Sequence, residues 1–315
     1  HPDLSGGANV ADAVPLKANM GLSYQGMNLV GQGFRLSRQE VEGLGYDPNR
    51  LPPVIRPYMN ARELTQKRED RFVIDLFGLD ADEARQQHPA LYQWLLERVK
   101  PERDHNKRDS YRLKWWIFGE PRSRMRPAME GLSRFVITPE TAKHRFFVFA
   151  PLDLLPDHQL YAVCTDDALV HGVLSSRHHI AWALAAGATL EDRPRWRNNA
   201  CFDPFPFPDA TESQKTRIRA LAEHLDAHRK QVQAAHPEAT MTVMYNALLR
   251  VHETAARGAS LTDRERAFHD AALIGVQDAG HDFEGGRLAC AVGAQKAEHL
   301  AAFDLKAQVV HCFDR

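Results

Sequence analysis

Apolar residues gather in several short stretches over the first two thirds of the chain. Four of them, RFVIDLFG (71–78), SRFVIT (133–138), RFFVFA (145–150) and LYAVCT (160–165), are rich in β-branched and aromatic residues, which is typical of strands. A fifth stretch, GLSYQGMNLVGQGFRLS (21–37), alternates apolar positions between glycines. That pattern predicts a hairpin of short strands. We therefore expect a substantial β component before residue 208.

Two stretches between these strands have helical spacing instead. ADEARQQHPALYQWLLERV (81–99) repeats apolar residues every three or four positions and predicts one helix. SSRHHIAWALAAG (175–187) predicts another, with a serine cap at its start and Gly187 at its end. This part of the chain is therefore of mixed α and β structure.

After residue 208 the pattern is helical only. A capping box at 211–214 precedes a long amphipathic helix, 240–253 predicts a second, and another capping box at 262–265 precedes a third. The fold class is therefore predicted as α+β, a mixed α/β domain followed by an all-α helical domain. The predicted divisions are a disordered lead-in at 1–15, the mixed domain at 16–208, the helical domain at 209–277 and a divergent tail at 278–315.

Composition places the chain among ordinary globular proteins. Apolar residues make up 43%, charged residues 26%, and the net charge is −1, which argues against a uniformly basic nucleic-acid binder. Four cysteines without a CxxC pair predict reduced thiols and a cytoplasmic location. No stretch reaches the length of a membrane span, so no membrane partner is expected. Because the chain starts with His1, we expect it to be a piece of a longer protein.

Sequence motifs for catalysis are absent. There is no GxxxxGK[ST] phosphate loop, no GxGxxG after a strand, no GxSxG elbow and no HExxH. His178 and His179 are adjacent, so they point to different faces of a helix and do not suit one metal ion. The sequence therefore predicts neither a catalytic residue nor a metal site. A hydrolase whose site lacks these motifs is one remaining alternative.

Basic residues concentrate between residues 97 and 126. Ten Lys or Arg stand there against five acids, interleaved with Tyr111, Trp115 and Trp116. Such a stretch suits phosphate contacts, although a solvated helix end with core tryptophans fits equally well. The residues predicted to contact a DNA backbone are Lys107, Arg108, Arg112, Lys114, Arg122 and Arg124.

Two polar loops carry side chains that suit base edges. One is TPETAKHRFF (138–147); the other is LEDRPRWRNNA (190–200), which leads into the proline-rich CFDPFPFP. Arg can bond guanine, Asn can bond adenine, and a carboxylate can accept from cytosine, so acids mixed with arginines favour base readout. A charged turn before a packed aromatic corner is the plainer alternative. The residues predicted to read bases are Lys143, His144, Arg145, Glu191, Arg193, Arg195, Arg197 and Asn198.

Long stretches of the chain, in order, resemble the target-recognition region of MmeI-like restriction-modification enzymes. Those are single-chain proteins that carry an adenine-specific DNA methyltransferase, and often a nuclease, ahead of this region. The resemblance covers about residues 20 to 275, and the sequence diverges beyond about Val276. The matching stretches are VIRPYMNARELTQ, RFVIDLFGLDADEAR, ERVKPERDHNKRDSYRLKWWIFGEPR, TPETAKHRFFVF, GVLSSRHHIAWALAAG and CFDPFPFP.

This resemblance implies sequence-specific recognition of double-stranded DNA. The two polar loops would contact bases, the basic stretch would contact the backbone, and the helical part would contact DNA or support the recognition domain. The methyltransferase motifs are not in this sequence, so S-adenosylmethionine would belong to the methyltransferase domain of the parent protein, and no cofactor is expected here. The alternative from another class is an assembly module, with a helical part that binds a protein partner and a solvated basic surface.

Overall fold

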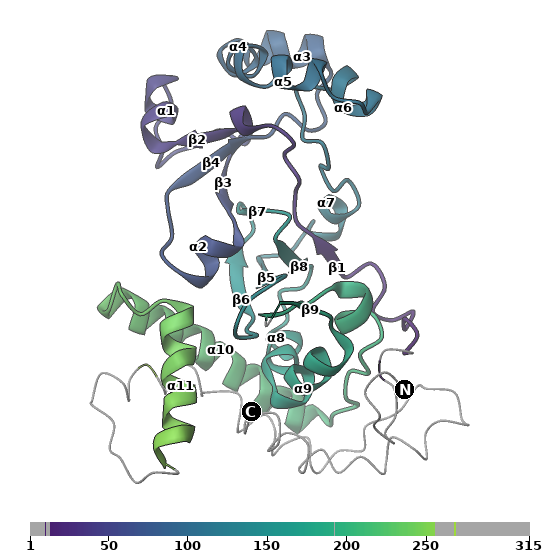
Figure 1. The fold of residues 1–315 in the computed structure, drawn as a ribbon, viewed down its shortest axis with the longest axis vertical. Coiled ribbons are helices and arrows are strands. Elements are labelled where there is room, and N and C mark those ends of the chain that lie inside the picture. The colour runs from purple at the N-terminus through teal and green to yellow at the C-terminus, as the bar shows by residue number, and fades with distance from the viewer. Residues whose placement is uncertain (1–9, 11–12, 192, 256–267, 269–315) are drawn as a thin grey trace. The chain divides into compact units, whose positions relative to one another are not determined.

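The computed structural model describes residues 10, 13–191, 193–255 and 268, which divide into two compact units (Figure 1). Unit 1 takes in the N-terminal residues up to Ser23, the segment Thr141–Phe147 and the chain from Asp167 onward. Unit 2 is formed by Tyr24–Glu140 and Val148–Asp166. The arginine-rich loop thus shares a unit with the C-terminal helices, and the sequence-based boundary at residue 208 stays a prediction.

Two four-stranded sheets form the β part of unit 2. In the first, the strand order is β1-β8-β5-β6, and β5 is antiparallel to both β6 and β8. In the second, the order is β2-β4-β3-β7, with β7 parallel to β3. The strands are β1 (Ser23–Gln25), β2 (Arg35–Ser37), β3 (Ile55–Met59), β4 (Arg71–Ile74), β5 (Arg134–Pro139), β6 (Val148–Pro151), β7 (Leu155–Pro156) and β8 (Leu160–Val163).

Short helices complete unit 2. Three of them begin with a capping box, in which Ser37, Asn60 or Asp80 accepts from the backbone three residues on, and a glutamate side chain bonds back. The helices are α1 (Arg38–Gly43), α2 (Ala61–Thr65), α3 (Ala81–Gln87), α4 (Pro89–Arg98), α5 (Lys100–Asp104), α6 (Asp109–Leu113) and α7 (Met125–Ala128), with a 3-10 turn η2 at Gln32–Phe34.

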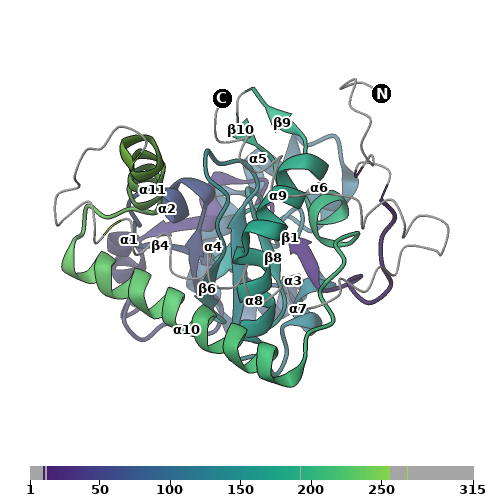
Figure 2. The ribbon, with the colours of Figure 1, turned by 90° about the horizontal axis from the view of Figure 1, so that it is seen from below.

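Unit 1 is mainly helical. Gly172 lets α10 approach α8 closely, because a Cβ at that position would lie 2.7 Å from Cγ2 of Ile218 (Figure 2). Thr211 and Gln214 form the predicted capping box of α10. The elements are α8 (Ala168–Ser175), α9 (Arg177–Ala186), β9 (Thr189–Leu190), β10 (Arg193–Pro194), the π-helical turn η3 (Asn198–Phe202), α10 (Glu212–Ala235) and α11 (Met241–Ala255).

The α+β fold class is confirmed, and the helix at 240–253 matches α11. The hairpin predicted at 21–37 is wrong, because β1 and β2 belong to different sheets. The single helix predicted at 81–99 divides at His88, since Pro89 has no N–H to continue the first helix and starts the next. The third C-terminal helix, most of the lead-in and the divergent tail lie outside the described residues.

Candidate nucleic-acid interface

The arginine-rich loop of unit 1 forms a small hairpin. Strands β9 and β10 are antiparallel, with Leu190 opposite Arg193 and Thr189 opposite Pro194. Two residues therefore make the turn, and Glu191 has a left-handed backbone with φ 56. Turns of this length need positive φ to match the strand twist, and a residue other than glycine adopts it at a cost of about 1 kcal/mol.

The segment 141–145 attaches to this hairpin. Thr141 forms an antiparallel bridge with Arg195, and the amide of Ala142 donates to the carbonyl of Pro194 at 3.4 Å. The guanidinium of Arg145 donates to the same carbonyl at 3.1 Å. The two loops that the sequence proposes as base readers are therefore neighbours in one unit, although about 50 residues separate them in the chain.

Trp196 fixes the base of the hairpin. Its side chain is fully buried, and its indole Nε1 donates to Nε2 of His179 at 3.2 Å. Burial, and then the charge of Arg145, lower the pKa of His179 to about 3. His179 is therefore neutral near pH 7 and can accept this hydrogen bond. The ring of Phe147 meets both side chains edge-on, with centroids 5.7 Å from Trp196 and 5.4 Å from His179.

The proline-rich segment packs as an aromatic cluster directly after the hairpin. Phe205 lies 4.5 Å from the ring of His179 and 5.1 Å from that of Phe207, measured between centroids. The side-chain amide of Asn19 donates to the carbonyls of Phe202 and Phe205 at 3.1 and 2.8 Å. These contacts satisfy carbonyls in a stretch where proline breaks regular structure. The packed corner and the charged turn are thus both present, one supporting the other.

Lys143 and His144 are held by helix α11. Both contact Oδ1 of Asn246, from Lys143 Nζ at 2.9 Å and from His144 Nε2 at 2.8 Å. Lysine can only donate, so the contacted amide atom is the oxygen, and His144 must carry its proton on Nε2. The imidazole also stacks on Tyr245 at 5.7 Å, and burial lowers its pKa. Asn246 and Tyr245 were not singled out in the sequence, because nothing in a helical pattern marks them.

The predicted base readers differ in exposure and fall into three groups. Glu191, Arg193, Arg197 and Lys143 are exposed, whereas Arg195, Asn198 and His144 are half-buried. The Asn198 amide donates to the carbonyl of Ser23 at 2.9 Å. Arg145 differs from all of these, since only 6% of it is exposed and its guanidinium bonds the hairpin. In the described structure Arg145 therefore supports the loop from within.

The predicted backbone-contacting residues belong to unit 2. The residues Lys107, Lys114 and Arg124 are exposed, and their side chains form no hydrogen bond or ion pair with the described residues. Arg108 bonds the hydroxyl of Tyr111 at 2.7 Å, and Arg112 bonds Asp109 at 2.5 Å. The remaining residue, Arg122, has φ 52 and donates to the carbonyl of Gly26 at 2.9 Å and to Oε1 of Gln25 at 2.9 Å.

One basic residue of the same stretch is wholly internal. Arg103 has no exposed surface and donates to the carbonyls of Leu29, Val30, Tyr111 and Ile117. Burial lowers its pKa.

The tryptophans of this stretch are also structural. Trp115 is 7% exposed, and the indole of Trp116 donates to the carbonyl of Leu79 at 3.0 Å. Trp115 thus belongs to the core, as the plainer alternative expects, whereas Trp116 is half-buried and held by a hydrogen bond.

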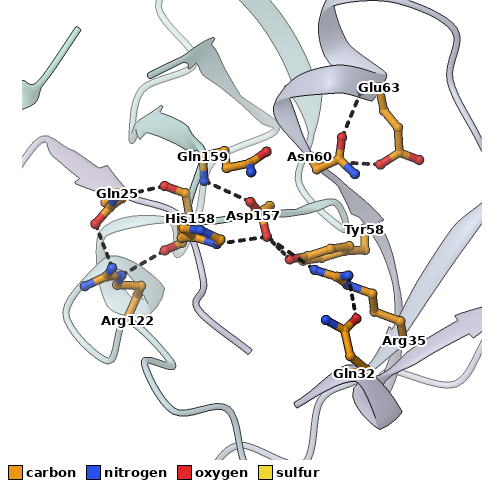
Figure 3. A network of polar contacts seen from close by, with 11 residues as sticks. Gln25, Gln32, Arg35, Tyr58, Asn60, Glu63, Arg122, Asp157, His158 and Gln159 are labelled. Atoms are coloured by element: carbon orange, nitrogen blue, oxygen red, sulfur yellow. Dashed lines mark hydrogen bonds and ion pairs between the residues drawn. The ribbon is translucent and has the colours of Figure 1, made fainter. Parts of the chain in front are cut away.

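A buried carboxylate organises the second sheet of unit 2 (Figure 3). Asp157 is 2% exposed and accepts from the hydroxyl of Tyr58 and from the amide of Gln159 at 2.9 Å. The ring of His158 lies 3.1 Å and the guanidinium of Arg35 3.9 Å from the same Oδ2 that Tyr58 contacts. Burial and the carboxylate raise the pKa of Tyr58, which keeps the hydroxyl a donor. Through these contacts one buried carboxylate connects β2, β3 and the end of β7.

No group of three or more His, Cys, Asp or Glu side chains suited to a metal ion occurs among the described residues. Within that same part of the chain, no helix has the length and apolar character needed to cross a membrane. The described side chains at the hairpin offer hydrogen-bond donors, acceptors and positive charge, which are the means of reading a polar surface.

Comparison with known proteins finds similarity to a restriction-modification enzyme and to a DNA methyltransferase. The family described as "MmeI, target recognition domain" matches residues 13–209. A solved structure of the Type IIL restriction-modification enzyme MmeI in complex with DNA aligns with a TM-score of 0.61 at 17% identity, over 85% of this chain and 37% of that one. DNA methyltransferase A of Bacillus subtilis (strain 168) is 26% identical over 100 residues, which are 30% of this chain and 11% of that protein. The chain thus spans well under half the length of both relatives.

Proposed function

We propose that this chain, which belongs to the MmeI target recognition domain family, reads a specific sequence of double-stranded DNA for a restriction-modification enzyme. The observation that carries the proposal is the junction of the two polar loops in unit 1. The hairpin 189–195 and the segment 141–145 form one surface, held by the bridge between Thr141 and Arg195. A two-stranded hairpin fits the major groove, where each base pair presents a distinct pattern.

Base readout is assigned to the exposed side chains of this surface. Arg193 and Arg197 suit guanine O6 and N7, and Glu191 suits the amino group of cytosine. We also assign base contacts to the exposed Lys143 and to the half-buried Arg195 and His144. Asn198 donates to the carbonyl of Ser23 and would contact a base with the remaining polar atoms of its amide. Arg145 is a positioning residue in this scheme, because its bond to Pro194 holds the hairpin from behind.

The rigid support of the hairpin is part of the mechanism. Trp196, His179 and the aromatic cluster fix its base before DNA arrives, so little conformational entropy is lost on binding. Backbone contacts from Lys107, Arg108, Arg112, Lys114, Arg122 and Arg124 would set the register without reading sequence. Of these, Lys107, Lys114 and Arg124 have side chains with no other task in the described structure.

The parent enzyme supplies the chemistry in this proposal. Its methyltransferase domain would bind S-adenosylmethionine and flip out an adenine within the site that the recognition surface has located. The partners of the chain are therefore duplex DNA and that methyltransferase domain. Cleavage of DNA by the parent would be a separate activity.

Duplex binding by the chain tests the proposal. A labelled random-sequence duplex is titrated by fluorescence anisotropy between about 50 and 200 mM salt, where log affinity should fall linearly with log salt for phosphate contacts. Rounds of selection from the random pool should then enrich a defined sequence. Absence of duplex affinity at the lowest salt would contradict the proposal and favour the assembly module. Binding without enrichment would reduce it to non-specific DNA contact.

A further inference from the structure

An exposed leucine accompanies the arginine of the recognition hairpin. Leu190 is 53% exposed although it is a large apolar residue. It lies directly opposite Arg193 in the register of β9 and β10, so both side chains are on the same face of the hairpin. The preceding Ala188 and Thr189, and Glu191 in the turn, are exposed as well. No neighbouring element of the described structure therefore covers this face.

The position of Leu190 is fixed by the backbone. The two-residue turn with Glu191 at φ 56 sets the register, and a slip by one residue would turn Leu190 to the other face. The bridge from Arg195 to Thr141 holds the other end of the hairpin. An apolar side chain that is held in place next to an arginine presents a small apolar contact beside a fork of donors.

The major groove offers a match for this pair. An arginine bonds O6 and N7 of guanine, and the C5 methyl group of a neighbouring pyrimidine is the apolar feature that lies in the same groove. Leucine gains by covering that methyl group, since both surfaces leave water. Polar hairpin residues alone would not distinguish thymine from a pyrimidine without the methyl group.

We propose that Leu190 is a specificity-determining residue that contacts the C5 methyl group of a pyrimidine adjacent to the guanine read by Arg193. This inference rests on the proposed function and deepens it, because it names one element of the recognised site. Thymine and 5-methylcytosine share this chemistry, and the experiment separates them.

The test uses single-atom-group changes in the DNA. The chain is first used to select a duplex from a random pool. Each thymine of the selected site is then replaced in turn by uracil, and each cytosine by 5-methylcytosine, and affinity is measured by anisotropy. One thymine-to-uracil replacement beside a guanine should weaken binding about 4-fold, as expected for removal of one buried methyl group. If the methyl-bearing base is 5-methylcytosine instead, methylation of one cytosine should strengthen binding by a similar factor.

Variants of the protein assign the effect to its side chain. Leu190→Ala should bind the methylated and unmethylated duplexes with equal affinity. That affinity should match the affinity of the wild type for the unmethylated duplex. Leu184→Ala is the matched control, because Leu184 is an equally large residue on α9 with 41% exposure, and it should keep the wild-type preference. Circular dichroism should show no change for either variant, since both residues are exposed.

The outcomes separate this inference from the function on which it rests. Selection of a sequence with no response to any C5 methyl group overturns the role of Leu190 and leaves DNA recognition standing. The same result follows if Leu190→Ala responds to the methyl group as the wild type does. Failure to bind any duplex at low salt overturns both proposals together.

Discussion

Two arginine-rich regions of this protein differ in what their guanidinium groups contact. In the stretch 98–126 of unit 2, the guanidinium groups of Arg103, Arg122 and Arg126 donate hydrogen bonds to backbone carbonyls, and Arg126 also donates to Asp75. In unit 1, Arg193 is exposed beside the turn of the hairpin, and Arg197 is exposed just after the hairpin. The difference lies in the backbone around them. Irregular segments leave carbonyls that buried guanidinium groups satisfy, as Arg103 does in unit 2 and Arg145 does at the hairpin carbonyl of Pro194, whereas side chains beside a two-residue turn are directed outward.

Basic charge in a sequence is therefore no measure of a binding surface. Arg103 belongs to a strongly basic stretch of the chain, yet its side chain has no surface exposed to a ligand.

Removal of Arg103 should have the largest effect. Arg103→Met removes the guanidinium that donates to four carbonyls, of which, among the described residues, only that of Leu29 also accepts from a backbone amide, and we expect unit 2 to lose about 3 to 5 kcal/mol of stability. Urea unfolding followed by tryptophan fluorescence measures this loss. Lys107→Met, an exposed site nearby, should change stability by less than about 0.5 kcal/mol. Equal stability of the two variants would contradict the structural role of Arg103.

His179, which accepts a hydrogen bond from Trp196 at the base of the hairpin, should make the stability of the fold depend on pH. His179 has its pKa lowered to about 3, so below the ordinary value of about 6.5 the unfolded state binds a proton that the folded state does not. The stability that the neutral, buried His179 contributes is fully present above pH 6.5. It is lost, at up to about 1.4 kcal/mol per pH unit, as pH falls toward 3. Asp203, whose pKa burial raises to about 6, acts in the opposite direction.

The difference between wild type and His179→Gln isolates the histidine from Asp203. Unfolding of both proteins by urea at pH 7 and pH 5 should show that the wild type loses more stability on acidification than the variant. An identical pH response in the two proteins would mean that His179 titrates normally in the fold.

Removal of Arg193 should act on selectivity and leave the fold unchanged. Arg193→Ala should reduce discrimination at one base pair by about 1 to 3 kcal/mol, and Glu191→Gln should do the same at one position. Selection from a random duplex pool measures this for each variant. Arg85→Ala, an exposed arginine on α3, is the control that should keep the wild-type sequence. An unchanged selected sequence in both hairpin variants would exclude them as base readers.

The smallest effect is expected from the exposed lysines of unit 2. Lys107→Met should weaken binding to all duplexes by a similar factor and reduce the slope of log affinity against log salt by about 1. Anisotropy titrations at several salt concentrations give this slope. A change in the selected sequence, with the slope preserved, would move Lys107 from the backbone-contacting group to the base readers.

Much of the local structure follows from the sequence. The capping box of α10 and the serine cap of α9 were predicted, because each depends on residues within a few positions of each other. The break at Pro89 is equally local, but the helical spacing over 81–99 concealed it. For the same reason the sequence fails at 21–37, where the partners of β1 and β2 are distant strands. Local patterns carry no information about such pairings.

The candidate site divides in the same way. Residue types along the chain show which loops carry arginines and acids, and the resemblance to a family indicated their task. The burial of Arg145, the proton position that Asn246 imposes on His144, and the face that Leu190 shares with Arg193 follow from tertiary contacts. These properties depend on which segments meet after folding. Burial and hydrogen-bond partners, rather than residue type, then set what each side chain can do.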